Sequence, residues 1–437
     1  MPKSIAAALL VVAALVGSTL SAAAQPAPPF NANRPGATLL LPYFEVDLAN
    51  PAGMTTLFSV NNASATAVLA HATVWSDLGV PVFAFNIYLT GYDVQTIDMR
   101  SVLTGSVPVT ASAGQDPTRQ ISPQGQISQD INFASCGGQL PPPAVPAFLQ
   151  DHMRASLTGR ASSIHGGQCV GRNMGQPGVA RGYVTVDTVN NCTLRFPTDP
   201  GYFVGGGIGD ATNQNVLYGD YQFVDLAAGF AAGDALVHLR ASATDVATST
   251  PGNYTFYGRL VGFSAADNRE PLSTTFAARF VAAKAYKQEN RAVLQQYLPP
   301  ASELIVWRDT KSAPQPFACG GAPSWYPLHQ ADLAAFDEQE NPQGLNGQVP
   351  FPAATQRVAV ASSALPVTPE SGWLFLNLNT PVAGQVPNLV NPARAQAWVT
   401  ILHRVHQGPT GGRYDIGLRA VRLDSAHDPI PFTLGLP

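Results

Sequence analysis

The chain has 437 residues, of which 45% are hydrophobic and only 12% are charged, and its net charge is −4. A negative chain without a cluster of lysine and arginine argues against a nucleic-acid-binding surface and against a site for anionic lipids. Its 39 glycines and 38 prolines favour many short strands joined by turns over a few long helices.

The first 24 residues have the composition of a secretory signal. Lys3 is followed by the apolar segment 5–16 and then by three alanines at 22–24, the order of charge, apolar core and small-residue cleavage site in a signal peptide. The apolar core is shorter than the roughly 20 residues of a spanning helix, so an uncleaved anchor is the weaker alternative. We predict a bacterial-type signal peptide at 1–24, cleavage before Gln25, no transmembrane anchor afterwards, and a secreted or periplasmic location.

Strand-like segments follow along most of the chain. They alternate apolar and polar residues, are rich in β-branched and aromatic side chains, and are bounded by turn residues. We predict a mainly β protein with one or more antiparallel β-sandwiches, long Gly/Pro-rich loops and one or two short helical insertions. The predicted strands are 38–47, 55–62, 68–75, 81–89, 92–99, 181–189, 216–225, 235–242, 254–263, 357–363, 372–379, 397–405 and 414–423.

These segments divide the chain into units. We predict an N-terminal β-sandwich-like unit at 25–112, a loop-rich segment with a short helix at 113–180, and a larger β-rich domain at 181–437. Within this division, residues 104–147 are rich in Gly, Pro, Ser, Gln and Asp and predict a long connection. Sequence alone leaves open whether the two ends of the chain form one sandwich or two.

Residues 70–89, AHATVWSDLGVPVFAFNIYL, contain a single charge, Asp77. The run alternates with period two on both sides of a turn containing Asp77 and Gly79, which predicts an antiparallel hairpin. On its second strand, one face carries Phe83, Phe85, Ile87 and Leu89. We expect that face to be buried and the face of Asn86 to meet solvent.

Two segments predict helices. Residues 145–159 carry Pro146 near the start and Gly159 at the end, the asymmetry typical of helix ends. Residues 274–298 are rich in alanine and are stopped by the proline pair at 299–300.

A weak internal echo links the two ends of the chain. TTLFSVNNAS followed by VLAHATVW is similar to GWLFLNLNTP followed by AWVTILHRV. It indicates either two related sandwiches or two ordinary strand pairs, and we favour the second interpretation.

The four cysteines are Cys136, Cys169, Cys192 and Cys319, and none has C-x-x-C spacing. An even number in an exported chain predicts two disulfides with three possible connectivities. The predicted helix lies between the first two, which favours Cys136–Cys169 and Cys192–Cys319.

Metal sites are weakly indicated. His403 and His406 are three apart on a predicted strand and therefore point to opposite faces, which argues against a shared ion. The acidic stretch near 336–347 offers oxygen ligands that suit calcium, although its spacing is not that of an EF-hand. The calcium candidates are Asp337, Glu338, Glu340 and Asn341; a solvated acidic turn is the alternative, and no other cofactor is expected.

Catalytic motifs give no further assignment. The chain has no G-x-S-x-G, H-E-x-x-H, P-loop or G-x-G-x-x-G pattern, so the catalytic residues are unknown. Segments 267–276 and 306–311 combine Arg with Asp or Glu, which predicts buried or half-buried ion pairs. A pair of carboxylates for glycoside hydrolysis needs a separation that sequence cannot show.

Several longer strings carry a resemblance. The chain resembles a group of secreted bacterial proteins of unassigned function over residues 38 to about 342. The strings are TLLLPYFEVD, TTLFSVNNAS, ARGYVTVDTVNNC, YGDYQFVD, ADNREPLSTTFAARF and IVWRDTK. The resemblance implies secretion and carries no catalytic or binding residues.

Three functions fit these observations. The first is an exported, non-enzymatic β protein that binds an extracellular ligand or surface partner, or serves in a surface or matrix structure. The second is a secreted polymer-degrading hydrolase that uses paired carboxylates. The third is a calcium-dependent adhesive or binding module. The sequence does not identify the ligand, the partner or the oligomeric state.

Overall fold

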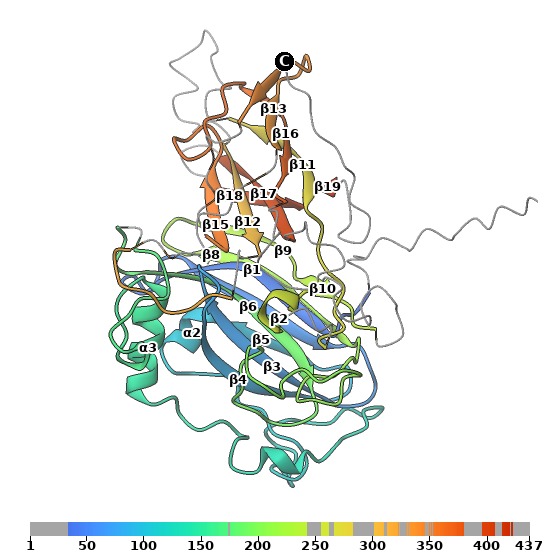
Figure 1. The fold of residues 1–437 in the computed structure, drawn as a ribbon. Helices are drawn as coiled ribbons and strands as arrows, with labels where there is room; N and C mark the ends of the chain where they lie inside the picture. The colour runs from blue at the N-terminus through green and yellow to red at the C-terminus, as the bar shows by residue number, and fades with distance from the viewer. Residues whose placement is uncertain are drawn as a thin grey trace, which may run out of the picture.

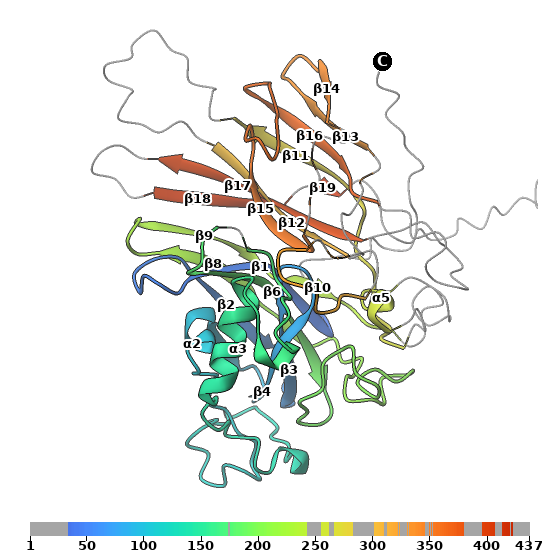
Figure 2. The same cartoon turned by 60° about the vertical axis from the view of Figure 1, so that its left-hand side comes forward.

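The computed structural model describes residues 34–173, 175–242, 255–261, 266–282, 301–309, 313–321, 332–345, 353–379, 396–406, 413–419 and 421–422, with the single residues 323, 330, 349 and 351. The predicted signal peptide at 1–24 lies outside these residues. Two antiparallel β-sandwiches make up most of the described chain, with the second standing on one end of the first (Figures 1 and 2). The prediction of a mainly β fold with antiparallel sandwiches is confirmed.

The first sandwich contains two sheets whose inner faces share one core. Sheet N1 has the order β10-β1-β6-β3-β4 and consists of β1 (Thr38–Asp47), β3 (Val68–Ser76), β4 (Pro81–Leu89), β6 (Val179–Val189) and β10 (Val237–Leu239). Sheet N2 has the order β5-β2-β8-β9, with β7 also beside β2. Its strands are β2 (Thr55–Asn62), β5 (Val94–Asp98), β7 (Leu217–Tyr218), β8 (Asp220–Asp225) and β9 (Phe230–Ala235).

The second sandwich also has two sheets around a core of its own. Sheet C1 has the order β14-β13-β16-β11-β19 and consists of β11 (Thr275–Val281), β13 (Asp332–Phe336), β14 (Pro342–Gly344), β16 (Ser371–Asn377) and β19 (Val421–Arg422). Sheet C2 has the order β15-β12-β17-β18. Its strands are β12 (Ala301–Arg308), β15 (Thr355–Ala359), β17 (Ala397–His406) and β18 (Arg413–Arg419).

Of the short helices, α2 and α3 lie together on one side of the first sandwich, and α5 lies away from them (Figures 1 and 2). The helices are α2 (Met99–Leu103), α3 (Ala147–Leu157) and α5 (Gly258–Val261), and the two 3₁₀ turns are η1 (Ala134–Cys136) and η2 (Ser163–His165). The helix predicted at 145–159 is therefore confirmed as α3, with Pro146 as its N-cap residue and Gly159 at a positive φ of 69° after its end.

The two sandwiches repeat the same topology. Across sheet N1, the strands β10-β1-β6-β3-β4 correspond one by one to β19-β11-β16-β13-β14 of C1. Across sheet N2, the strands β5-β2-β8-β9 correspond to β15-β12-β17-β18 of C2. The register agrees as well. Thr38 lies opposite Asp187 in the first sandwich, and Thr275 lies opposite Asn377 in the second.

Side-chain details repeat with this register. Trp75 pairs with Pro81 at the start of the β3–β4 hairpin, and Phe336 pairs with Pro342 in β13–β14. Trp75 stacks on Tyr183 with ring centroids 5.5 Å apart, and Phe336 stacks on Trp373 at 4.0 Å. The Thr56 hydroxyl accepts a hydrogen bond from Glu45 N at 3.0 Å, and the Ser302 hydroxyl accepts one from Val281 N at 2.8 Å.

Glycine is required at one equivalent position in each sandwich. A Cβ on Gly182 would lie 2.0 Å from the carbonyl oxygen of Trp75, and one on Gly372 would lie 1.8 Å from that of Phe336. No side chain fits at such distances, so both strand pairs approach each other only because these residues lack a Cβ.

The echo noticed in the sequence joins the wrong strands. It compares β2 and β3 with β16 and β17, whereas the topology makes β12 the counterpart of β2 and β16 the counterpart of β6. The interpretation as ordinary strand pairs is correct for those strings, even though two related sandwiches are present.

The sheets also join segments that sequence analysis assigned to different units. β6, which starts at Val179, lies between β1 and β3, and β8 lies beside β2. Residues before 112 and residues 179–239 therefore build one sandwich, and the long segment between them is a connection on its surface.

The predicted hairpin is confirmed as β3 and β4, but both of its faces are covered. Phe85, Ile87 and Leu89 belong to the core of the first sandwich, as predicted. Asn86, expected at the surface, is only 5% exposed, because the connection that follows β5 packs over that face.

Two other expectations were wrong. Residues 275–281, predicted as part of a helix, form strand β11; the rest of that prediction, from 283 to 298, lies outside the described residues. Residues 258–261, within the predicted strand 254–263, form α5. In β11 the buried residues Phe276, Ala278 and Phe280 alternate along the strand, so tertiary packing decided the structure against the helix propensity of alanine.

Candidate functional site

A cleft between the two sandwiches is lined by six charged side chains. Its volume is ≈ 460 Å³. One wall comes from the first sandwich and from the segment before β6, and the other comes from β12 and β15. The lining residues are Tyr43, Glu45, Met54, Arg172, Gln176, Arg181, Asp225, Ala228, Phe230, Glu303, Gln356, Arg357 and Ala359.

An irregularity in β1 shapes the first wall. The β1–β6 register shifts between Leu41 and Phe44, where Pro42 cannot donate to the sheet. The bulge exposes the Pro42 carbonyl, which accepts a hydrogen bond from the Thr355 hydroxyl of β15. Thr355 N donates to the Asp77 carbonyl at 3.0 Å. These two bonds hold the start of β15 against the first sandwich.

Glu45 and Arg181 form the charged part of that wall. They lie opposite each other on β1 and β6, and Arg181 Nε lies 3.3 Å from Glu45 Oε2. The Tyr43 hydroxyl donates to the same oxygen. Burial, followed by the Glu45 charge, raises the pKa of Tyr43, so its hydroxyl stays a proton donor at neutral pH.

The opposite wall carries a second ion pair. Arg357 on β15 donates through Nε and Nη2 to Glu303 on β12, with a Nε–Oε2 distance of 2.7 Å. Burial alone would lower the pKa of Arg357, but the carboxylates of Glu303 and Glu45 raise it above its ordinary value. The guanidinium therefore remains charged between the two sandwiches.

Arg172 closes the cleft at the segment before β6. Its Nε lies 2.9 Å from Asp77 Oδ2, and its backbone N donates to Asp77 Oδ1 at 3.0 Å. Burial raises the pKa of Asp77, and Arg172 opposes that shift. In the described part of the chain, both Nη atoms of Arg172 and the Nη1 atoms of Arg181 and Arg357 make no hydrogen bond.

Two carboxylates of the cleft come from different sandwiches. Glu45 and Glu303 line one cleft, as a pair of catalytic carboxylates would. Each of the two is held by an arginine across its own sheet, Glu45 by Arg181 and Glu303 by Arg357.

The disulfides differ from the favoured pairing. The bonds are Cys136–Cys192 and Cys169–Cys319, so the prediction that all four cysteines pair is confirmed and the favoured connectivity is wrong. Cys136 and Cys169 lie on either side of α3 in the sequence. In the fold, however, Cys136 lies beside Cys192, after β6, and Cys169 lies beside Cys319, after β12. Sequence proximity therefore did not identify the partners.

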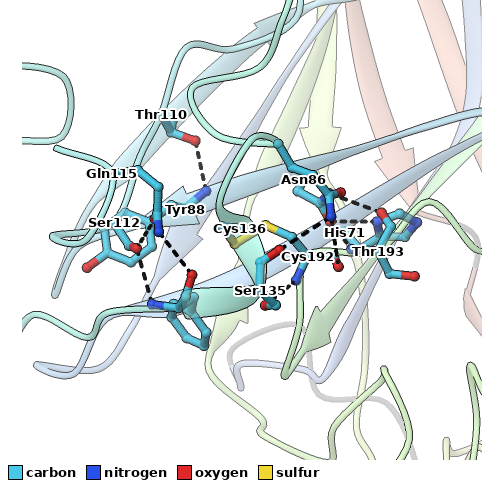
Figure 3. The surroundings of a disulfide bond; sticks show 12 residues. His71, Asn86, Tyr88, Thr110, Ser112, Gln115, Ser135, Cys136, Cys192 and Thr193 are labelled. Atoms are coloured by element: carbon cyan, nitrogen blue, oxygen red, sulfur yellow. Dashed lines mark hydrogen bonds between the residues drawn. A yellow bond between two sulfur atoms is a disulfide. The ribbon is translucent and has the colours of Figure 1, made fainter.

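Cys136–Cys192 fastens the long connection to the end of β6 (Figure 3). The backbone N of Cys192 donates to the Ser135 hydroxyl at 3.1 Å. Beside the bond, Asn86 accepts from His71 Nδ1 at 3.0 Å and donates to the Thr193 carbonyl at 3.0 Å. Asn86 thus links His71 of β3 to the segment that follows β6. Cys169–Cys319, by contrast, joins the first sandwich to the loop after β12.

The calcium candidates form a tight turn between β13 and β14. Asp337 Oδ1 accepts from Gln339 N at 2.9 Å and from Asn341 N at 2.8 Å, and its Oδ2 accepts from Asn341 Nδ2. Glu338 lies 3.6 Å from Arg279, and Glu340 has a φ of 64°. Among the described residues, no group of three or more His, Cys, Asp or Glu side chains is placed to hold a metal. Calcium binding at Asp337, Glu338, Glu340 and Asn341 stays a prediction.

The histidine pair lies on β17 as expected. His403 Nδ1 is 2.9 Å from the Ser302 hydroxyl on the adjacent strand, a structural contact, and the side chain of His406 lies outside the described residues. Of the other residues that sequence analysis singled out, Arg269 forms the expected buried ion pair, 3.6 Å from Asp187. Arg259 and Asp309 lie 3.5 Å apart.

Asp187 is the centre of a fully buried polar cluster on the outer face of N1. The hydroxyls of Tyr202 and Tyr257 donate to its Oδ2 at 2.8 and 3.0 Å, and Thr38 donates to its Oδ1. Burial, followed by the Asp187 charge, raises the pKa of both tyrosines. The cluster fixes the segments around 202 and 257 on the sheet.

Sequence reasoning missed the cleft residues Glu45, Arg181, Glu303 and Arg357. They lie on four different strands, β1, β6, β12 and β15, and only the topology brings them together. The irregular run at Pro42 was the one available signal, because a proline within a strand indicates an edge or a bulge.

Comparison with known proteins leaves this reading unchanged. No protein-family model matches the chain, and no curated protein matches it. Within the described residues, no helix is both long and apolar enough to cross a membrane.

Proposed function

We propose that the chain is an exported, non-enzymatic binding protein that holds its ligand in the cleft between the two sandwiches. The observation that carries this proposal is the set of arginine N–H groups, without a protein partner among the described residues, around a cleft of ≈ 460 Å³. Cavities of 300–1,000 Å³ with a few convergent polar groups are typical ligand sites.

Export rests on two further features. The predicted signal peptide at 1–24 directs the chain across a bacterial inner membrane. The two disulfides fit the oxidising compartments, the periplasm or the medium, in which such bonds persist. A surface or matrix role is compatible with the same architecture, since a cleft between rigid domains can hold a segment of a partner.

Melting temperature tests the proposal. We would screen disaccharides, acidic disaccharides and tripeptides against the wild type and against Ala228→Phe, which fills the cleft from the exposed turn before β9. Ala227→Phe is the matched control, because Ala227 is equally exposed in that turn but does not line the cleft. A ligand that raises the melting temperature of the wild type and the control, but not of Ala228→Phe, supports a cleft site.

A secreted hydrolase is the second candidate, because Glu45 and Glu303 share the cleft. Chromogenic aryl glycosides would reveal turnover. If the wild type released the chromophore, and Glu45→Gln and Glu303→Gln each abolished release, the chain would be an enzyme and the binding proposal would be wrong.

A further inference from the structure

We propose that the cleft recognises a neutral saccharide of one or two rings, or the end of a longer neutral glycan. This inference rests on the proposed function, since it assigns a ligand class to the same cleft. Three properties of the lining carry it: its charge balance, its mixture of donors and acceptors, and its apolar patches.

The charge pairing in the cleft selects against anionic ligands. The lining contains three arginines, Arg172, Arg181 and Arg357, and three carboxylates, Glu45, Asp225 and Glu303. Arg181 and Arg357 are each paired with one of these carboxylates. An anionic ligand would find each arginine already paired, Arg172 with Asp77, Arg181 with Glu45 and Arg357 with Glu303, and would have to be desolvated without compensation.

Donors and acceptors alternate around the cleft. The free Nη atoms of the arginines offer N–H donors, while Oε1 of Glu45 makes no hydrogen bond within the described residues and offers an acceptor beside them. A hydroxyl group both donates and accepts. A ligand with several hydroxyls therefore satisfies both sets, whereas a carboxylate would satisfy the arginines and be repelled by Glu45.

Apolar surface lies next to these polar groups. Met54 and Phe230 line the cleft on the side of the first sandwich, where the C–H faces of a sugar ring can pack against them. The volume of ≈ 460 Å³ lies near the lower end of the range of small-molecule sites. It accommodates one or two rings and leaves a longer chain outside.

Calorimetric titration with cellobiose, maltose and N,N′-diacetylchitobiose tests this assignment. Digalacturonate and trialanine serve as the acidic and peptide probes. We expect at least one neutral disaccharide to bind saturably to the wild type and to Ala227→Phe, and to bind at least about tenfold more weakly to Ala228→Phe, a change of about 1.4 kcal/mol. Gln176→Ala, which removes a lining amide but no ion pair, should weaken binding by less.

Each other outcome has a defined meaning. Binding of only digalacturonate or trialanine, with the same dependence on Ala228, would overturn the saccharide class and leave the proposed cleft site standing. Binding of a disaccharide that is unaffected by Ala228→Phe would place the sugar elsewhere and overturn the inference. If no probe of any class bound, both the inference and the proposed function would fail.

Discussion

The two sandwiches share one topology and one register, but the outer faces of their second sheets, N2 and C2, carry different side chains. On sheet N2, Ser59 and Asn61 occupy the positions that Ile305 and Trp307 occupy on C2. Tyr218, which pairs with Asn61, corresponds to Trp398, which pairs with Trp307. The apolar face of C2 packs against the first sandwich. On N2, Ser59 and Asn61 are buried but Tyr218 is exposed. Side chains, rather than topology, therefore decide which copy forms the interface.

Sheets N2 and C2 each line a groove or cleft at equivalent residues of their strands. Leu57, Thr96 and Asp98 line a groove of ≈ 540 Å³ on N2, and their counterparts Glu303, Arg357 and Ala359 line the cleft. On N2 the segment around 106–108 forms the far side of the groove, whereas on C2 the other sandwich does. The same backbone position thus becomes an open groove in one copy and a charged cleft in the other.

We expect the largest loss of stability when Asp187 is replaced by the residue at the equivalent position of the second sandwich. Asn377 stands at the equivalent position, whereas Asp187 forms an ion pair with the buried Arg269. Asp187→Asn leaves that charge uncompensated and should cost about 3–5 kcal/mol of unfolding free energy. Urea unfolding of Asp187→Asn, Arg269→Met and the double variant measures it. If the double variant lost as much stability as the two single variants together, the pair would not be coupled.

Trp398 and Tyr218 provide a matched test of the interface. They are equivalent in register, but Trp398 is 3% exposed and Tyr218 is 41% exposed. Trp398→Ala should cost about 3–5 kcal/mol through lost packing, and Tyr218→Ala should cost less than about 1 kcal/mol. Thermal unfolding of both variants measures these two losses of stability. Similar losses would mean that the face of N2 is also an interface.

Asn86→Ala and Phe85→Ala compare the two faces of strand β4. The first sandwich covers the outer face of β4 with its long connection, so the substitution leaves His71 and the Thr193 carbonyl without a partner. Each unsatisfied buried group costs about 1–3 kcal/mol. Phe85→Ala, on the core face, should cost about 3–5 kcal/mol. An Asn86→Ala variant as stable as the wild type would indicate that water replaces the lost bonds.

The smallest effect should come from His152 in the connection between β5 and β6. Its Nδ1 accepts from the Ser162 hydroxyl at 2.6 Å, and its Nε2 donates to the Val82 carbonyl at 3.2 Å, so the fold needs the neutral ring. Burial, followed by the neighbouring His165, lowers the pKa of His152 to about 4.

The sign of the pH dependence follows from that pKa. Above the ordinary pKa of about 6.5, the folded and unfolded chains are both neutral at this site, and its contribution to stability is complete. Between about 6.5 and about 4 only the unfolded chain takes up the proton, so stability falls as the pH falls. Melting temperatures of the wild type and His152→Gln across that range check the effect. Parallel curves for the two proteins would contradict it.

The sequence predicted the fold class because burial leaves a period-two pattern that can be read locally. The hairpin at β3 and β4 is the clearest case, since Asp77 and Gly79 punctuate two alternating runs. The covered face of Asn86 could not be predicted, because a connection far along the chain covers it. β11 was misread for the opposite reason: its alternating pattern was present, but its alanines pointed to a helix.

The site was beyond the reach of the sequence. Glu45 and Arg181 are 136 residues apart, and they meet because β1 and β6 pair across the intervening strands. The disulfides show the same limit, since four cysteines allow three connectivities and only the path of the connection selects one. What sequence analysis did supply were the residues most sensitive to local geometry, such as the proline and glycine at the ends of α3.

Cys169–Cys319 also defines how the chain would carry a mechanical load. The bond closes a span of 150 residues that contains β6 to β12, so a pulling force applied at the two ends would bypass those strands. With about 3.3–3.6 Å per extended residue, roughly 500 Å of chain would be withheld from extension until the bond is reduced. An oxidised molecule would therefore behave as a short tether, and the central strand of N1 would be shielded from the force that unfolds its neighbours.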